Sequence, residues 1–159
     1  MHKKLFIMLF IFVFPVITSW FLFYYHASFH LKTLNHGTLI SSPVDVKYLY
    51  SEMENGQQKK WRVIYVASEI CDSQCREIDH QLKQVQKALG KDSDRVNTIL
   101  LSNQNKQLPK LQAVLNFAVD NKIYLVDPLG NLFMYYSSDV DPMNVLKDLK
   151  RVLEVSQIG

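Results

Sequence analysis

The chain has 159 residues, a hydrophobic fraction of 48% and a formal net charge of +3. This length predicts a single domain, for which roughly 130 residues remain once a membrane segment is set aside. Lysines and arginines are interspersed with aspartates and glutamates, which argues against the concentrated basic stripe of a nucleic-acid-binding protein. Two cysteines are also too few for the disulfide framework of a small secreted domain.

The N-terminus predicts a membrane anchor. Lys3 and Lys4 precede a run without a charge over residues 5–25. A helix of this length can cross a hydrocarbon core, and Pro15 in its middle is tolerated in a membrane helix. The two lysines favour a cytoplasmic N-terminus, which would place the rest of the chain on the other side of the membrane.

A cleaved signal peptide is the alternative for this segment. It needs a shorter apolar core and a small-x-small cleavage site, for which Ala27 and Ser28 are a weak candidate after bulky aromatic residues. We therefore favour a retained signal-anchor. His26, His30 and His36 follow the span and could hold a metal, although histidines in such a linker are more often plain polar residues.

The domain after the anchor is expected to open with irregular structure. Residues 35–43 are punctuated by glycine and proline and predict a loop or short edge hairpin, and residues 44–50 are a candidate short strand. Residues 61–67 give the clearest strand, because they are rich in β-branched and aromatic side chains. Both faces of this strand are apolar, which is typical of a strand inside a sheet covered by helices.

An amphipathic helix is predicted over residues 75–89. Ile78, Leu82 and Val85 recur at helical spacing and predict one buried stripe. Asp72 is a candidate N-cap, and Gly90 is expected to end the helix.

The remaining elements predict an α/β domain. Strands are expected at 96–101, 122–126 and 132–136, and helices at 109–119 and 142–155. Crossovers between the strands at 61–67, at 96–101 and later in the chain imply parallel pairs, and the turn at 127–131 joins the last two strands into an antiparallel hairpin at the edge. This order predicts a thioredoxin-like, four-stranded mixed sheet with flanking helices.

One segment of the last hairpin has an alternative role. Residues 133–136 could give an exposed strand a docking patch for a partner, with Met134 as a remote candidate for a copper ligand. Tyr135, Tyr136 and Trp61 are more readily explained as core and edge-strand residues.

Cys71 and Cys75 are the candidate site. They lie four residues apart where the strand at 61–67 leads into a helix, so their sulfurs can face the same point. Free backbone N–H groups and the helix dipole favour a thiolate there, whereas Asp72 and Glu69 oppose it. Two such thiols can form a disulfide or bind a soft cation such as Cu(I). Because so short a loop constrains the unfolded chain little, we favour a redox-active or metal-binding pair over two structural thiols.

The anchor, the strand at 63–67 that leads into C-D-S-Q-C at 71–75, and the run I-Y-L-V-D-P-L-G-N at 123–131 together resemble the Sco/SenC group of the thioredoxin superfamily. Members of this group are membrane-anchored, carry C-x3-C after a strand, and act in copper delivery to cytochrome c oxidase or in thiol control of that site. The resemblance implies an accessory protein of respiratory oxidase assembly. It also implies Cys71 and Cys75 as the Cu(I)-binding or redox pair, and an oxidase subunit as partner.

The sequence departs from that group in its ligand set. The group carries prolines beside its cysteines, where this chain has Asp72 and Arg76. Its third copper ligand is a histidine before the strand that corresponds to 122–126, but no histidine follows His80 here. His80 lies about 140° round the helix from Cys75 and is expected to face solvent. Oxygen from Asp120 or Asn121 would suit Cu(I) poorly.

Two other functions stay open. The domain could be a non-catalytic adaptor that docks on a membrane complex, or a thiol-disulfide oxidoreductase of exported proteins. Such oxidoreductases usually have C-x2-C and a cis-proline before the strand that faces the cysteines, where this chain has Asn121 and Lys122. We expect a cytoplasmic stub at 1–4, a transmembrane span at 5–25, a linker at 26–40 and the exported domain at 41–159.

Overall fold

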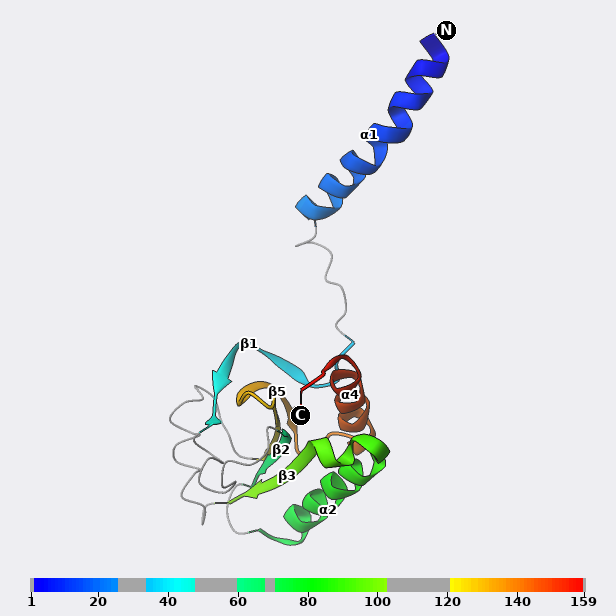
Figure 1. Ribbon diagram of the computed structural model, residues 1–159. Coiled ribbons are helices and arrows are strands. Elements are labelled where there is room, and N and C mark those ends of the chain that lie inside the picture. The colour runs from blue at the N-terminus through cyan, green and yellow to red at the C-terminus, as the bar shows by residue number, and fades with distance from the viewer. Residues whose placement is uncertain (1, 26–33, 48–59, 68–70, 103–120, 159) are drawn as a thin grey trace. The chain divides into compact units, whose positions relative to one another are not determined.

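The structure is a computed structural model that describes residues 2–25, 34–47, 60–67, 71–102 and 121–158 (Figure 1). It divides into two compact units, Met1–Leu34 and Asn35–Gly159. The second unit therefore includes residues 35–40, which we expected in the linker.

The first unit contains helix α1 (His2–Tyr25). It is long and apolar enough to cross a membrane, with a mean hydropathy of 2.5. The hydroxyl of Thr18 donates to the carbonyls of Phe14 at 2.9 Å and Pro15 at 3.0 Å, so this polar side chain is hydrogen-bonded within the helix. The helix predicted at 5–25 is confirmed in length and composition, and its orientation stays a prediction.

The second unit is built on one five-stranded sheet in the order β1-β5-β4-β2-β3. The strands are β1 (Thr38–Asp45), β2 (Trp61–Val66), β3 (Val96–Leu101), β4 (Lys122–Val126) and β5 (Asn131–Ser137). β2 is parallel to β3 and antiparallel to β4, and β5 is antiparallel to both β4 and β1. The mixed sheet and the strands predicted at 61–67, 96–101, 122–126 and 132–136 are confirmed.

Three details of the predicted topology are wrong. The sheet has five strands rather than four, because residues 38–45, where we expected a loop or short edge hairpin, pair with β5 as an edge strand. A register shift between Leu39 and Val44 lets this edge strand contain Pro43. β4 lies on the far side of β2 from β3 and is antiparallel to β2, so the parallel pairing expected with the later strands holds only between β2 and β3. The β4–β5 hairpin is not at the edge, since β1 covers it.

Helices α2 (Ser73–Ala88) and α4 (Pro142–Val155) cover one face of the sheet (Figure 1). Their buried stripes are formed by Ile78, Leu82, Val85, Val145, Leu146, Leu149 and Leu153. These side chains pack on the residues of β2 that point to this face, among them Val63 and Tyr65. The opposite face carries a second buried cluster that includes Ile64, Tyr124 and Leu132. Both faces of β2 are buried, as its sequence predicts.

Both helices start at an aspartate. Asp72 accepts a hydrogen bond from the backbone nitrogen of Cys75, and Asp141 accepts one from that of Met143. Gly90 follows α2 with a φ of +63°, a backbone conformation that favours glycine, and opens the 3-10 helix η3 (Gly90–Arg95). The cap predicted at Asp72 and the helix end predicted at Gly90 are confirmed, and Asp72 fixes the start of α2 at the candidate site.

The alternative of a docking patch at 133–136 is wrong, and the preferred interpretation as a core residue holds for Tyr136. β5 is an inner strand between β1 and β4, and Met134 and Tyr136 are buried. The ring of Phe133 packs edge-on against Trp61, and that of Tyr135 lies near Tyr124. Some expectations lie outside the described residues, namely His26, His30, Glu69, Asp120, the strand end at 48–50 and the helix at 109–119.

Candidate functional site

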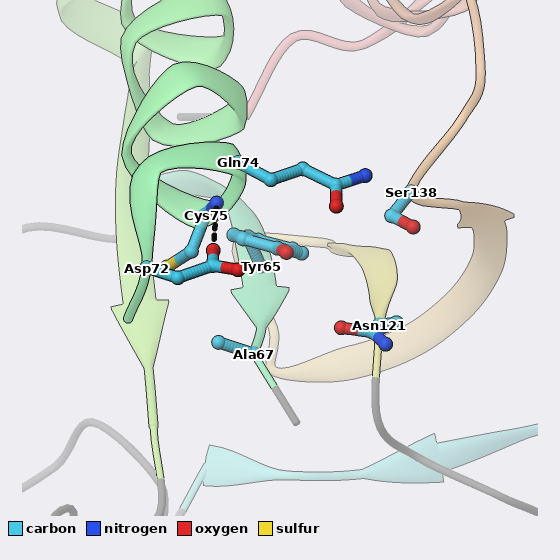
Figure 2. Close-up of a pocket in the computed structure, with 7 residues that line it drawn as sticks. All are labelled: Tyr65, Ala67, Asp72, Gln74, Cys75, Asn121 and Ser138. Carbon is cyan, nitrogen blue, oxygen red and sulfur yellow. Dashed lines mark hydrogen bonds between the residues drawn. The ribbon is translucent and has the colours of Figure 1, made fainter. Parts of the chain in front are cut away.

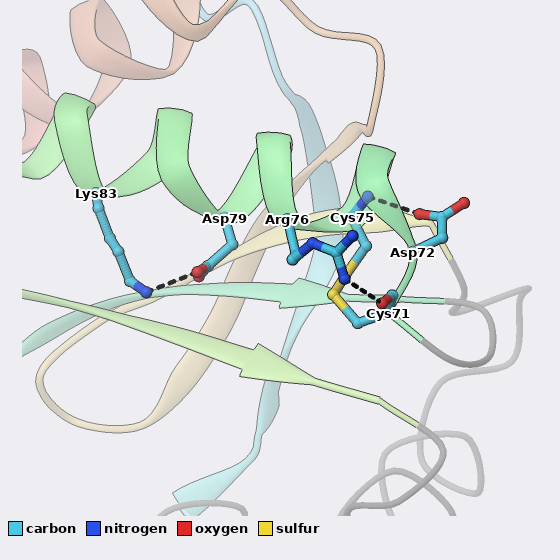
Figure 3. Close-up of a disulfide and its surroundings, with 6 residues drawn as sticks. All are labelled: Cys71, Asp72, Cys75, Arg76, Asp79 and Lys83. Carbon is cyan, nitrogen blue, oxygen red and sulfur yellow. Dashed lines mark hydrogen bonds and ion pairs between the residues drawn. A yellow bond between two sulfur atoms is a disulfide. The ribbon is translucent and has the colours of Figure 1, made fainter.

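The two cysteines meet at the N-terminal end of α2 (Figure 3). Cys71 precedes the helix and Cys75 lies in its first turn, with their Cα atoms 5.2 Å apart. The two sulfurs are bonded in a disulfide. The expected convergence of the two sulfurs is therefore present in the structure.

The two cysteines differ in accessibility. Cys75 is 4% exposed and packs into the core with α2 and β2, whereas Cys71 lies only partly buried at the rim of that cluster. A thiolate from another molecule can therefore reach the sulfur of Cys71 more readily than that of Cys75. In disulfide exchange, access decides which of the two sulfurs is attacked.

Charged side chains flank the disulfide (Figure 3). The Oδ1 atom of Asp72 accepts from the backbone nitrogen of Cys75 at 2.8 Å, and Arg76 Nη1 donates to the carbonyl oxygen of Cys71 at 3.5 Å. The carboxylate thus uses the helix-end N–H group that would otherwise be available to a thiolate at Cys75. The guanidinium of Arg76 instead holds the backbone of Cys71, the more accessible cysteine.

A recess of about 100 Å³ opens beside Cys75 (Figure 2). Tyr65 and Ala67 line it from β2, Asp72 and Gln74 from the start of α2, and Asn121 and Ser138 from the ends of β4 and β5. Figure 2 shows these polar side chains around one opening. The strands and α2 therefore bring five polar side chains next to one sulfur of the disulfide.

Tyr65 is the most buried polar member of this recess, with 3% of its surface exposed. Burial raises the pKa of its hydroxyl, and the negative charge of Asp72 raises it further. The phenol is therefore neutral and available as a hydrogen-bond donor. The alternation of β2 had already placed Tyr65 on the face of Trp61 and Val63, but the sequence did not identify it as a site residue.

Asn121 lies where an oxidoreductase of this fold would be expected to carry a cis-proline. It has a left-handed φ of +54°, and its carbonyl accepts from the backbone nitrogen of Ser138 at 3.1 Å. Among the described residues no peptide bond is cis. Asparagine tolerates this conformation better than most residues, which allows the chain to turn into β4 beside the recess. Gln74 and Ser138 carried no signal in the sequence.

The described part of the chain contains no group of three His, Cys, Asp or Glu side chains that could hold a metal ion. His80 is exposed and its ring lies 3.4 Å from the amide of Gln84, so the prediction that it faces away from the sulfurs is confirmed. His36 is bonded to Asp148. Met134 is buried, with its sulfur 3.0 Å from the hydroxyl oxygen of Tyr136. Among the described residues, the donor set at the disulfide is therefore two sulfurs.

The sequence from residue 61 onward matches one known protein family. The family is described as a transmembrane-like, thioredoxin-like, C-terminal domain, and the matched residues are 61–118 and 109–156. These segments span the disulfide, the sheet from β2 onward and α4. The thioredoxin-like fold class predicted from the sequence is confirmed. No curated protein matches the sequence.

Several solved structures are similar in fold. ScoI of Bradyrhizobium japonicum with copper bound is 16% identical with a TM-score of 0.46, and the match covers 75% of this chain and 99% of that one. Trgpx in its apo form is 11% identical with a TM-score of 0.45, over 61% and 82% of the two chains. A SCO1/SenC family lipoprotein from Bacillus anthracis is 14% identical with a TM-score of 0.43, over 77% and 98%.

Proposed function

Because the chain belongs to the family of transmembrane-like, thioredoxin-like C-terminal domains, we propose that it is a membrane-anchored thiol–disulfide exchange protein. Its target would be a pair of cysteines in a respiratory oxidase subunit during assembly, on the periplasmic side of a bacterial inner membrane. The resemblance of the anchor, the C-x3-C turn and residues 123–131 to the Sco/SenC group supports this choice of partner.

The observation that carries the proposal is the unequal accessibility of the two bonded sulfurs. A target thiolate attacks Sγ of Cys71 and forms a new S–S bond, while the bond between Cys71 and Cys75 breaks. The electron pair leaves with Sγ of Cys75, which takes a proton from water. A second target thiolate then displaces Cys71, so the target gains a disulfide and this protein becomes a dithiol. The same steps in reverse reduce a target disulfide.

Copper handling is a second form of the same proposal, with Cu(I) as cargo. Once reduced, Cys71 and Cys75 offer two soft thiolates, which Cu(I) prefers. Within the described ranges no third His, Cys or carboxylate ligand lies with them. Two sulfurs alone would hold the ion, which suits transient transfer better than storage.

Exchange is tested with the full-length chain in detergent micelles and single-cysteine variants. Cys75→Ser leaves the accessible sulfur free and is expected to trap a mixed disulfide with oxidised glutathione. The matched variant Cys71→Ser leaves only the buried sulfur and is expected to trap it at least about tenfold more slowly. Equal trapping by the two variants would contradict the assigned attack on Cys71, and a wild type whose disulfide exchanges with no dithiol would refute the proposal.

The copper form needs its own measurement. The fully reduced wild type is expected to bind about one Cu(I) in competition with a colorimetric chelator, and Cys71→Ser is expected to lose it. No binding by the reduced protein would remove the copper form and leave exchange standing. Full oxidase assembly in cells that carry the Cys71→Ser, Cys75→Ser double variant would instead favour the non-catalytic adaptor.

A further inference from the structure

The recess beside Cys75 is lined mostly by polar side chains. The side-chain ends of Tyr65, Gln74, Asn121 and Ser138 make no hydrogen bond with any described residue. Tyr65 is the most informative of the four because it is 3% exposed and its hydroxyl points into the opening (Figure 2). The hydroxyl oxygen itself is open to the recess, so a bound group can reach it.

Among the described residues that line the recess, Asp72 is the only carboxylate or base. The hydrogen bond to Cys75 uses only its Oδ1 atom. Its Oδ2 atom has no partner within the described part of the chain. The charge of Asp72 also acts on the hydroxyl of Tyr65, across the recess.

Two cations on the described elements around the recess point elsewhere. Arg76 lies on the Cys71 side, where it donates to the carbonyl of that residue (Figure 3). Lys122 lies over the ring of Tyr135, 5.0 Å from its centroid, on the opposite face of the sheet. The charge that the described lining residues contribute to the recess is therefore negative, and the polar atoms around it can accept hydrogen bonds.

We propose that this recess binds a cationic side chain, the ammonium of a lysine or the guanidinium of an arginine, that flanks the target cysteine of the partner polypeptide. The proposal rests on the proposed exchange function and names its substrate class. Asp72 supplies the charge, and the free oxygens of Tyr65, Asn121 and Ser138 accept from the cation. A carboxylate next to the target cysteine would meet like charge and be disfavoured.

The test compares short peptides that differ only in the residues around one cysteine. The series is X-Gly-Cys-Gly-X with X as Lys, Gln or Glu, so that the direction of binding does not matter. The rate at which each peptide reduces the disulfide of the full-length chain is measured in micelles. The same peptides react with oxidised glutathione in parallel, and division by that rate removes the effect of X on the intrinsic reactivity of the thiol.

Asp72→Asn removes the charge, and asparagine remains a good N-cap, so the start of α2 is kept. The matched control is Asp94→Asn, the same change on the exposed Asp94 in η3, beyond the opposite end of α2. Sixteen helical residues separate the two ends, about 24 Å, which exceeds the screening length at physiological salt. Tyr65→Phe removes only the hydroxyl.

The wild type is expected to prefer the Lys peptide over the Glu peptide by about two- to fivefold after normalisation, the range of a partly exposed ion pair. Asp72→Asn should abolish this preference, added salt should weaken it, and Asp94→Asn should leave it intact. Tyr65→Phe should slow the Lys peptide alone. Equal normalised rates for the three peptides would overturn the inference and leave exchange standing, whereas no reaction with any peptide would refute the exchange function itself.

Discussion

Asp148 binds His36 twice, through the backbone nitrogen at 2.8 Å and through Nδ1 at 3.1 Å. The same carboxylate accepts from the backbone nitrogen of Gly37 at 3.1 Å and from the hydroxyl of Tyr136 at 2.9 Å. Asp148 is 2% exposed, so a buried charge in α4 is satisfied by the first residues of the second unit and by β5. The segment that enters β1 is thereby fixed to the last helix.

Asp148→Asn is expected to lower the free energy of unfolding by about 2–4 kcal/mol. The amide keeps the shape of the side chain but offers only one oxygen to the donors of His36, Gly37 and Tyr136, and its NH₂ group faces them. Urea unfolding followed by near-ultraviolet circular dichroism measures the change. Asp139→Asn, on an exposed side chain, is the control and should stay within about 0.5 kcal/mol of wild type.

The stability of the domain should depend on pH through the same carboxyl group. Burial raises the pKa of Asp148, but the hydrogen bonds from His36, Gly37 and Tyr136 outweigh it and hold that pKa below its ordinary value. A depressed pKa stabilises the fold above the unfolded value, near about 3.9, and this contribution is lost as the pH falls through the folded pKa. Wild type should therefore lose stability below about pH 4 more steeply than Asp148→Asn. If the free energies of unfolding of wild type and Asp148→Asn fell in parallel with pH, the assignment of this pH dependence to Asp148 would be contradicted.

Two glycines should respond differently to alanine. A Cβ on Gly37 would lie 2.6 Å from Met134 Sδ and 2.6 Å from Tyr136 Cε1, inside the packed core beside Asp148. A Cβ on Gly90 would meet nothing within 4 Å, but its φ of +63° is strained for alanine. We expect a loss of about 2–3 kcal/mol for Gly37→Ala, from overpacking, and about 1 kcal/mol for Gly90→Ala. Urea unfolding tests the order, and a larger loss at Gly90 would contradict it.

The local elements of this fold can be predicted from the sequence because their signals are local. The strand at 61–67 can be recognised from its composition. Asp72 and Asp141 each directly precede an amphipathic helix. The direction of β4 and the pairing of β1 with β5 cannot be read in this way, because they depend on strands far apart in the chain. For the same reason, nothing local marks Asp148 as buried, since the donors at His36 lie 112 residues away.

In the candidate site, too, the local features could be predicted from the sequence and those that depend on distant strands could not. The C-x3-C spacing and the predicted cap place Cys71 and Cys75 together, because all three residues lie within one turn. The recess could not be foreseen, because Tyr65, Asn121 and Ser138 come from the ends of three strands whose order is set by the whole sheet. For Tyr65, the alternation of β2 predicted only that its side chain lies on the same face of the strand as Trp61 and Val63.

Removing the cap at Asp72 should weaken α2 without breaking the disulfide. Asp72→Ala leaves the backbone nitrogen of Cys75 without its acceptor, and we expect a loss of about 1 kcal/mol in the free energy of unfolding. Asp72→Asn should lose a few tenths at most, because asparagine also caps helices. Urea unfolding of the oxidised proteins gives both values, and Asp141→Ala at the start of α4 should match Asp72→Ala. An equal loss for Ala and Asn at position 72 would show that charge, rather than capping, is what stabilises this end.

Reduction of the disulfide should leave the domain folded. The Cys71–Cys75 bond closes a loop of only five residues, for which the loop-entropy relation gives about 2 kcal/mol. Asp72 caps α2 and Cys75 packs into the core independently of the bond, so neither contact is lost when it opens. Urea unfolding with and without a phosphine reductant should show a fall of about 2 kcal/mol in wild type and none in the Cys71→Ser, Cys75→Ser variant. Unfolding of the wild type on reduction alone would mean that the bond is a structural requirement, and a protein that must keep its disulfide to stay folded could not cycle between the two forms that exchange needs.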